Sequence, residues 1–377
     1  MQRALGAGLI AGALLPCLAL AEPPQQPIET SAGAIRVTEL AGGLVHPWGM
    51  AFLPDGRILV TERPGRLRLV SATGELAEMP VAGTPEVWAQ GQGGLLDVVA
   101  DPNFADNQLV WLSFAEGGAG GTAGTAVGRG RLEGEALQEF ETVWRQVEKV
   151  PGRNHFGSRI VFIDADTLFV TTGERFRFQP AQDLSQTLGV VVRITRDGQP
   201  VADNPFVGQE GARGEIYSYG HRNIQAAAID PATGSLIVAE MGPKGGDELN
   251  LIEPGANYGW PLVSWGTHYD GTDIPDPPTR PEFRDALTQW TPVIAPSGMV
   301  FYRGDLFPDF RGDALIGGLR AEAIVRVRLS DGAAEEQERI ALGERIREVD
   351  EGPDGSIYVL TDDPRDGALW KLSPGSN

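Results

Sequence analysis

One unit of sequence recurs six times along the 377-residue chain and constrains the fold more than any other feature. Each copy holds a short apolar strand, a turn built on Asp, Gly or Pro, and a second, very apolar strand; a third strand follows. The copies are residues 48–62, 95–114, 159–173, 226–240, 298–317 and 347–361. Their spacing of about 45 to 70 residues suits one four-stranded sheet per copy, joined by loops of variable length.

Six such sheets arranged around an axis form a β-propeller, which leaves no long exposed sheet edge. The sequence therefore predicts an all-β fold, a six-bladed β-propeller of four-stranded antiparallel blades, over residues 34–377. Residues 34–40 are interpreted as an extra strand that joins the last blade beside residues 368–372 and closes the ring. The alternative is a β-sandwich with irregular repeats, although a sandwich gives no reason to repeat the same unit six times.

The first 21 residues have the pattern of a secretory signal peptide. Arg3 is followed by an apolar run over residues 4–20, and a small-x-small pattern ends at Ala21. The alternative is a membrane anchor, but the run is short for a bilayer span and contains Pro16. The sequence therefore predicts export to the periplasm or beyond the cell.

Cleavage after Ala21 would leave an N-terminal arm, residues 22–33, before the propeller. The sole cysteine, Cys17, would be removed, which excludes disulfides and cysteine-based metal sites from the mature protein. The formal net charge is −20, and the basic residues are scattered without a Lys/Arg run. Nucleic acids and anionic membranes are therefore not expected as partners, and no second apolar segment could span a bilayer.

In a propeller, the loops that enter the inner strands converge on one face, so residues far apart in sequence can line one pocket. The polar residues at these positions and at the ends of second strands are Glu62, Gln92, Asn154, His155, Glu174, Arg222, Asn223, Glu240, Arg320, Arg345 and Arg347. Arginine pairs bidentately with carboxylates, so the pocket suits a planar polyanion. The chain has only three lysines, and any single arginine could instead be an ordinary surface cation.

His155 is one of only four histidines and stands between an asparagine and Gly-Ser-Arg. It could be a hydrogen-bonded core histidine. Its place at the rim favours a catalytic base, with Glu174 bonded to one ring nitrogen and the other nitrogen free. His221, which precedes Arg222, is interpreted as structural.

Residues 240–250, followed by residues 256–261, have the composition of a cation site. Gly and Pro let backbone carbonyls face an ion, and Asp247 and Glu248 supply hard oxygens, which suits calcium. An acidic turn without a metal is the alternative, because the spacing is not that of an EF-hand loop.

These residues resemble the soluble pyrroloquinoline quinone (PQQ)-dependent glucose dehydrogenases, and more closely their shorter relatives, the PQQ-dependent aldose sugar dehydrogenases. The resemblance covers nearly all of the mature chain. Its markers, in a shared order, are residues 46–49, 91–96, 154–159, 220–223, 242–251, 257–261, 295–297 and 353–355. It implies a six-bladed propeller, in agreement with the repeat count.

The resemblance also implies roles for individual residues. His155 corresponds to the catalytic base and Glu174 to the acid that orients it. The residues that correspond to quinone contacts are Gln92, Asn154, Arg222, Asn223, Arg320, Arg345 and Arg347. The carbonyls of Gly242 and Pro243 would bind the calcium between protein and quinone, and Glu248 with the carbonyl of Tyr258 would bind a second, structural calcium.

Some positions depart from the pattern of the glucose dehydrogenases. Met241 and Val293 stand where polar groups are expected, and Arg320 stands where that branch has lysine. The insertions linked with dimer formation are absent, which favours a monomer and an open sugar site.

The predicted function is oxidation of the anomeric hydroxyl of an aldose to a lactone, by hydride transfer to PQQ, with electrons passing to an unidentified acceptor. A calcium-dependent propeller lactonase is one alternative, although a hydrolase has no use for converging arginines. A sugar-binding propeller without catalysis is the other, and in it His155 would be dispensable.

Overall fold

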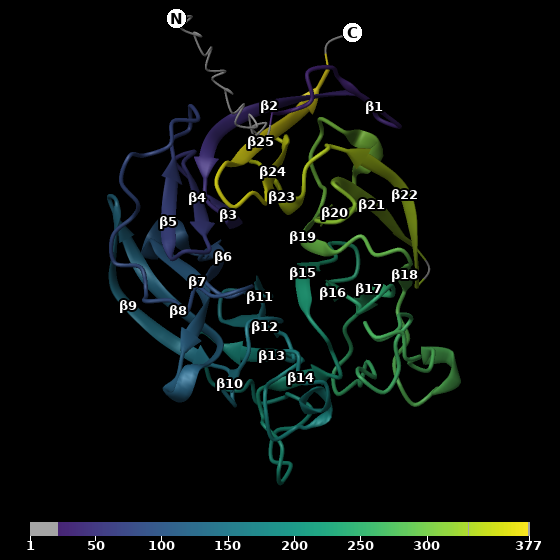
Figure 1. The fold of residues 1–377 in the computed structure, drawn as a ribbon. Coiled ribbons are helices and arrows are strands. Elements are labelled where there is room, and N and C mark those ends of the chain that lie inside the picture. The colour runs from purple at the N-terminus through teal and green to yellow at the C-terminus, as the bar shows by residue number, and fades with distance from the viewer. Residues whose placement is uncertain (1–21, 331, 376–377) are drawn as a thin grey trace, which may run out of the picture.

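The computed structural model describes residues 22–330 and 332–375 and consists of six antiparallel sheets arranged in a ring (Figure 1). The first three sheets, each from its inner strand outward, are β3 (Pro47–Phe52), β4 (Ile58–Glu62) and β5 (Arg66–Val70); β6 (Leu95–Ala100), β7 (Leu109–Gly117) and β8 (Thr122–Glu133), with β9 (Ala136–Arg145) and β10 (Val150–Pro151) both paired to β8; and β11 (Gly157–Phe162), β12 (Thr167–Thr172), β13 (Val190–Thr195) and β14 (Ile216–Tyr219).

The other three sheets follow the same plan. They are β15 (Ile224–Ile229), β16 (Leu236–Glu240), β17 (Asp247–Leu251) and β18 (Thr288–Trp290); β19 (Pro296–Phe301), β20 (Ala314–Gly318), β21 (Ala323–Ser330) and β22 (Ala333–Ala341); and β23 (Ile346–Glu351), β24 (Ile357–Thr361), β25 (Gly367–Pro374), β2 (Gly33–Leu44) and β1 (Ile28–Thr30). The predicted all-β, six-bladed fold is confirmed.

Among the described residues, helical structure is limited to single turns. They are α1 (Phe104–Asn107) and the 3-10 turns η1 (Ala119–Gly121), η2 (Gln179–Gln182), η3 (Pro277–Thr279) and η4 (Pro308–Phe310). Within residues 22–330 and 332–375, no helix has the length and apolar character needed to cross a membrane.

Three sheets have the predicted four strands, two have five, and the first has three. In the first sheet, the fourth position is taken by residues that form only isolated bridges, Leu76 with Val70 and Val81 with Leu67. Five residue steps separate Leu76 from Val81, whereas only three separate their partners Val70 and Leu67 on β5, so the two bridges do not belong to one regular ladder.

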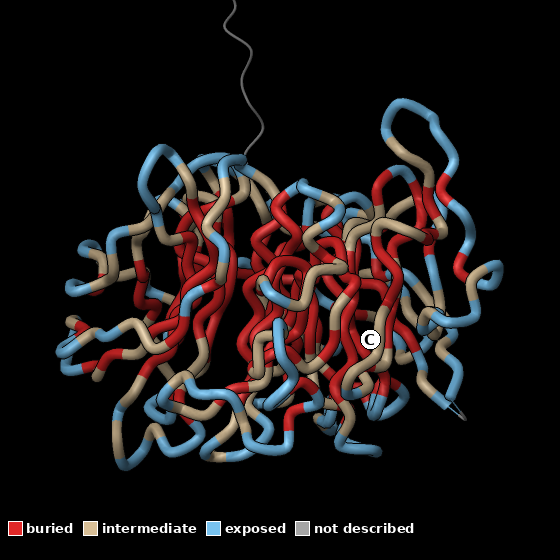
Figure 2. The backbone as a smooth tube through the Cα atoms, turned by 90° about the horizontal axis from the view of Figure 1, so that it is seen from below, coloured by how far each residue is buried: buried red, intermediate tan, exposed pale blue. Residues whose placement is uncertain are grey.

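The ring is held together by apolar packing between neighbouring sheets. β3 contacts β6 and β23, β11 contacts β6 and β15, and β19 contacts β15 and β23. Between the second and third sheets, Trp111 and Val127 pack with Ile160 and Val170, all at most 4% exposed. Each fully buried side chain of this kind stabilises the fold by roughly 1.5–3 kcal/mol. Figure 2 shows the buried residues along the strands and the exposed residues in the loops at both ends of the ring.

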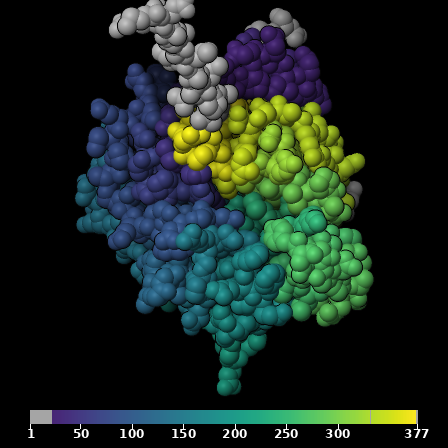
Figure 3. All heavy atoms as spheres, viewed as in Figure 1, coloured from purple at the N-terminus to yellow at the C-terminus, as the bar shows by residue number. Residues whose placement is uncertain are grey.

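Pairing between the two ends of the chain closes the ring. β2 pairs antiparallel with β25, with Val37 opposite Leu372, as the sequence predicts. In Figure 3 the N-terminal residues, in purple, lie against the C-terminal residues, in yellow. β1 extends this sheet and lies within the predicted N-terminal arm. The predicted signal peptide, residues 1–21, lies outside the described residues.

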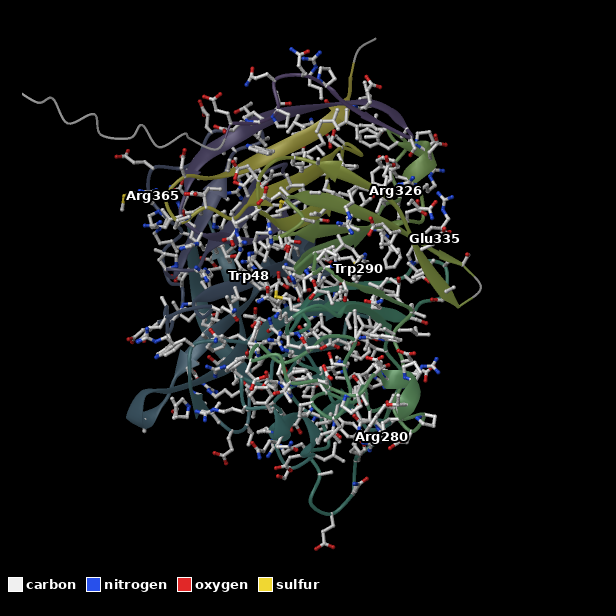
Figure 4. The ribbon with its side chains drawn as sticks, turned by 45° about the vertical axis from the view of Figure 1, so that its right-hand side comes forward. Trp48, Arg280, Trp290, Arg326, Glu335 and Arg365 are labelled. Carbon is white, nitrogen blue, oxygen red and sulfur yellow. The ribbon has the colours of Figure 1, made fainter. Side chains whose placement is uncertain are left out.

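A buried ionic network crosses the axis of the ring. Arg159 on β11 donates from Nη1 to Asp97 Oδ1 on β6, at 3.1 Å, and to Glu348 on β23; its Nε donates to the carbonyl of Gln225 on β15, at 2.7 Å. The guanidinium carbon lies 4.1 Å from the ring centroid of Trp48 on β3, which Figure 4 shows inside the ring. Burial raises the pKa of Glu348, although Arg159 opposes the rise. One cation therefore joins the inner strands of five sheets.

Candidate functional site

The loops that precede the inner strands meet on one side of the ring, which we call the inlet face. Gln92, before β6, accepts a hydrogen bond at Oε1 from the backbone N–H of His155, before β11, at 2.7 Å. The backbone N–H of Gly157 in turn donates to Asn223 Oδ1, before β15, at 3.1 Å. The structure thus brings together residues that the repeat pattern places in three separate blades.

His155 and Glu174 form a buried pair at the inlet face. The Nδ1 atom of His155 lies 2.5 Å from Glu174 Oε1, and the two side chains are 6% and 0% exposed. The second carboxylate oxygen accepts from the backbone N–H groups of Arg177 and Phe178, the latter at 2.7 Å. No described residue bonds to Nε2 of His155. The pair therefore leaves one ring nitrogen free to accept a proton.

The environment keeps His155 neutral and Glu174 ionised. Burial lowers the pKa of His155, and the charge of Arg222 lowers it further, while the hydrogen bond to Glu174 opposes the fall. Burial alone would raise the pKa of Glu174, but hydrogen bonds from His155, Phe178 and Arg177 outweigh it and leave that pKa lowered. A neutral imidazole with its proton on Nδ1 is the form that can act as a base at Nε2.

The predicted amides line the same loops, with different contacts. Asn223 reaches the sulfur of Met241 with Nδ2, at 3.8 Å, in addition to its bond with Gly157. Asn154 is held through its backbone carbonyl, which accepts from Nε of Arg175 at 2.9 Å. The structure therefore brings Asn154 and Asn223 to the inlet face beside His155.

Arg222 lies next to the predicted calcium carbonyls. Its Nη1 donates to the carbonyls of Met241 and Gly242, both at 2.8 Å, and its Nη2 donates to Tyr269 Oη at 3.1 Å. Its Nε is buried with no hydrogen-bond partner among the described residues. Asp247 fixes the carbonyl loop, because it accepts the backbone N–H of Gly242 at 2.8 Å. Burial raises the pKa of Asp247 to about 6.

Arg345 and Arg347 share one acid. Asp362 Oδ2 accepts from Nη2 of Arg345 at 3.0 Å and from Nη2 of Arg347 at 2.8 Å, while His46 Nδ1 lies 3.5 Å from its Oδ1. Burial would raise the pKa of Asp362, but the charge of Arg347 and the contacts with His46 and Arg345 hold it far below its usual range. Arg320 is exposed and forms no side-chain hydrogen bond with the described residues.

A third arginine, Arg63, lies at the same place. Burial and the charges of Arg347 and Arg345 lower its pKa, although Asp362 opposes this. Its Nη1 donates to the carbonyl of Gly91 at 2.8 Å, which fixes the loop of Gln92. The Nε atoms of Arg63 and Arg347 are buried without a partner within the described part of the chain. Among the described residues, Asp362 is the one carboxylate that pairs with these arginines, so this corner has more positive charge than that acid neutralises.

An acidic cavity lies beneath Arg222. It has a volume of about 10 Å³, enough for one water molecule or ion, and its lining includes Glu240, Glu248 and Tyr258. Burial raises the pKa of Glu248 well above its usual range, and the charge of Glu240 adds to the rise. His221 bonds Glu240 through Nδ1 and Ser218 through Nε2, both at 2.9 Å, and is wholly buried, as expected for a structural residue. Among the described residues, no group of three or more His, Cys, Asp or Glu side chains could hold a metal.

Aromatic rings flank the entrance to the site. Phe176 packs edge-on against His155, with ring centroids 5.3 Å apart, and Tyr269 lies 6.2 Å from Phe176. Together with Phe178 and Trp260, they line a hollow of about 410 Å³ that borders Arg222. Phe176 and Tyr269 are 40% and 62% exposed, so this hollow opens to solvent.

Arg63 and Asp362 are not among the site residues predicted from the sequence. Both follow directly on the second strand of a sheet, Arg63 after β4 and Asp362 after β24. Glu174 is predicted because it follows β12, the second strand of its sheet. Asp362 has the same position after β24, and Arg63 lies one residue beyond Glu62, so the signal for both is present in the sequence.

Comparisons with known proteins agree on the family of this chain. The glucose/sorbosone dehydrogenase family matches residues 44–371. The chain is 44% identical to aldose sugar dehydrogenase YliI of Escherichia coli over 349 residues, which cover 90% of the chain and 93% of that protein.

Two solved structures match nearly the whole ring. The soluble aldose sugar dehydrogenase of Escherichia coli, in its apo form, superposes with a TM-score of 0.86 at 43% identity, over 90% of this chain and all of that one. The PQQ-bound aldose sugar dehydrogenase of Streptomyces coelicolor superposes with a TM-score of 0.73 at 29% identity, over 92% of this chain and all of that one.

Proposed function

The chain belongs to the glucose/sorbosone dehydrogenase family, and we propose that it oxidises the anomeric hydroxyl of aldose sugars to lactones, with His155 as the general base. The observation that carries the proposal is the buried His155–Glu174 pair, with Nδ1 bonded at 2.5 Å and Nε2 free. Family membership makes the chain an oxidoreductase that acts on sugars. It therefore favours a dehydrogenase over a lactonase and over a sugar binder without catalysis.

PQQ is the proposed cofactor, because the Streptomyces coelicolor relative was solved with PQQ bound. The residues at the inlet face fit this molecule. Its carboxylates require cationic donors, and Arg63, Arg222 and Arg347 each have a buried Nε without a partner among the described residues. An anionic ligand beside these guanidinium groups would offset their excess positive charge.

Arg222, Arg345 and Arg347 are proposed to hold the quinone, with Arg320 at the rim and with Gln92, Asn154 and Asn223 as amide contacts. Met241 offers its thioether sulfur to Asn223 where the glucose dehydrogenase pattern has a polar side chain. A thioether is a weak acceptor, so the arginines carry most of the proposed affinity.

Calcium is proposed at two places. The carbonyl of Gly242 already faces a cation, the guanidinium of Arg222, and with the carbonyl of Pro243 it would bind a calcium next to the quinone. Glu248 and the carbonyl of Tyr258 would bind a second calcium at the acidic cavity. Oxygen ligands of this kind suit a hard cation, and a cation there would reverse the unfavourable burial of the Glu248 carboxylate.

The chain's own residues account for the proton. Oxidation of the sugar removes a proton from the anomeric hydroxyl, and Nε2 of His155 accepts it. Glu174 stabilises the resulting imidazolium through Nδ1 and keeps the ring oriented. PQQ, when bound, supplies the two-electron acceptor for the hydride that leaves the anomeric carbon.

The test is a variant in which His155 is replaced by alanine. General-base assistance is worth about 10² to 10⁴ in rate, so His155→Ala should lower kcat by at least that range in a dye-reduction assay with PQQ, calcium and an aldose. PQQ affinity, followed by quenching of tryptophan fluorescence, should change little. Near-full activity of the variant would refute the role of His155, and a wild-type protein that needs no PQQ would refute the cofactor.

Export is also proposed, because residues 1–21 have the features of a signal peptide. N-terminal sequencing of the mature protein would test it. The monomeric state and the identity of the electron acceptor stay predictions.

A further inference from the structure

Arg175, the residue after Glu174, is a buried cation that the proposed mechanism does not use. It is 1% exposed. Its Nε donates to the carbonyl of Asn154 at 2.9 Å, its Nη2 to the carbonyl of Gly152 at 2.6 Å, and its Nη1 to the carbonyl of Ala123. All three nitrogen atoms of the guanidinium are thus used on backbone carbonyls.

The charge of Arg175 has no ion-pair partner in the described part of the chain. Among residues 22–330 and 332–375, no carboxylate oxygen lies within 4.0 Å of its guanidinium, whereas Arg159, which is also buried, meets both Asp97 and Glu348. Burial, with repulsion from Arg177, lowers the pKa of Arg175 to about 10, so it stays charged at neutral pH. A buried charge without a counter-ion is costly, and general packing does not require it.

The contacts of Arg175 enclose the segment that carries His155. Two of its three carbonyls, from Gly152 and Asn154, precede His155, and its guanidinium carbon lies 3.7 Å from the ring centroid of Phe156, which follows. His155 has φ 55°, in the left-handed region, which is strained for a residue other than glycine. Such a conformation persists only where neighbours fix it, and Arg175 fixes both sides.

We propose that Arg175 is a positioning residue for sugar oxidation: it clamps residues 152–156 so that His155 keeps its bond to Glu174, and its unpaired charge acts on that pair. Only the expected effect on kcat rests on the proposed function. The clamp itself is a property of the protein without cofactor.

The charge of Arg175 should shift the titration of His155 in a direction that can be measured. The charged groups that face His155 are Glu174 from the end of β12, Arg175 beside it, and Arg222 from the loop before β15. Arg177 contributes only its backbone N–H to Glu174. Removing the Arg175 cation removes a repulsion of the imidazolium, so His155 should bind its proton more tightly and titrate at higher pH.

Two variants separate the clamp from the charge. Arg175→Lys keeps the charge but offers one nitrogen to three carbonyls, whereas Arg175→Met removes both. Arg177→Met is the matched control, because Arg177 is an exposed arginine of the same segment whose side chain also bonds a backbone carbonyl, that of Pro151, at 2.8 Å.

The first measurement is an NMR titration of the cofactor-free protein, which has only four histidines. The His155 signal is assigned by its loss in His155→Asn. Arg175→Met should raise the midpoint of His155 by about half a pH unit or more, Arg175→Lys should leave it close to wild type, and Arg177→Met should leave it unchanged.

The second measurement is kcat and KM of the PQQ-loaded enzyme. Both Arg175 variants should lose about 10- to 100-fold in kcat, with the sugar KM within threefold of wild type, and Arg177→Met should lose less than twofold. A kcat of Arg175→Lys within twofold of wild type would overturn the clamp. This test can be made even if Arg175→Met does not fold. An unchanged His155 midpoint in Arg175→Met would overturn the electrostatic part. Wild-type protein without sugar oxidation would instead count against the proposed function.

Discussion

Replacing Glu174 with glutamine tests the His155–Glu174 pair more sharply than deleting either residue. A glutamine side chain has nearly the shape of glutamate, but one of its two acceptor oxygens becomes an NH₂ donor. In the structure, one carboxylate oxygen of Glu174 accepts from His155 and the other accepts from the backbone N–H groups of Arg177 and Phe178. Glutamine can satisfy one side of this arrangement, not both.

The backbone donors decide which way the amide turns. Two N–H groups converge on one oxygen of Glu174 and cannot move without shifting residues 174–178, so the amide oxygen of the glutamine should face them. Leaving both donors unpaired in a buried site would cost about 1–3 kcal/mol each. The NH₂ group then faces Nδ1 of His155, which must become an acceptor and carry its proton on Nε2. In this tautomer the free nitrogen is a donor and cannot act as a base.

The expected loss follows from the tautomer. An inverted imidazole forfeits general-base assistance, about 10² to 10⁴ in rate, and a wrong tautomer in a comparable hydrolase triad costs about 10⁴. Glu174→Gln should therefore lower kcat by about 10³- to 10⁴-fold. Glu174→Ala removes the orienting group without enforcing the wrong tautomer, so it should lose less, about 10²- to 10³-fold.

The assay is dye reduction at saturating aldose, PQQ and calcium. Thermal unfolding serves as the control for folding, and tryptophan quenching serves as the control for PQQ affinity. The order of the two variants is the decisive result, because a simple loss of stability would make the alanine variant worse. A glutamine variant more active than the alanine variant, or one within tenfold of wild type, would refute the tautomer argument.

Three further predictions concern a buried acid, the arginines of the site and the proposed calcium. Burial raises the pKa of Asp350 to about 7 from an ordinary value of 3.8, so the folded state loses stability as the pH rises through 7 and this carboxyl ionises. At pH 8, Asp350→Asn should therefore have a higher free energy of unfolding in urea than wild type, by a few kcal/mol at most, and the difference should close near pH 4. Arg347→Gln should weaken PQQ binding about 10- to 100-fold by fluorescence titration, and the half-exposed Arg345 should matter less when replaced in the same way. Calcium removal with a chelator should lower the unfolding temperature of wild type, and Glu248→Gln should lose most of that response.

The sequence predicts the ring because its evidence is repetition. Each unit places two apolar strands around a turn, and six such units predict six sheets, as observed. The closing strand is also predictable, since the last unit contributes three strands of its own, β23, β24 and β25, and residues 34–40 can supply the fourth. Strand counts are less predictable, because they depend on local register: in the first sheet, the segment from Leu76 to Val81 is two residues too long to form a regular ladder with β5.

Position within the repeat also predicts which residues meet at the inlet face. His155 precedes an inner strand and Glu174 follows a second strand, so their contact follows from the blade geometry. Arg175 could not be predicted in this way. Its three acceptors are backbone carbonyls of Ala123, Gly152 and Asn154, and the directions of carbonyls depend on local φ and ψ, which the residue types do not reveal.

The sequence does not predict which acids pair with each arginine. Arg159 and Arg347 both stand on inner strands, yet Arg159 meets two carboxylates at the axis, whereas Arg347 shares the single acid Asp362 with Arg345. Arg63 adds its charge to the same corner. In a chain with net charge −20, acids are abundant, so a cluster short of them is not a product of composition. Several arginines that share too few acids, rather than arginines as such, are therefore the feature that points to an anionic ligand. A single unpaired arginine such as Arg175, whose donors are all used on backbone carbonyls, does not carry the same meaning.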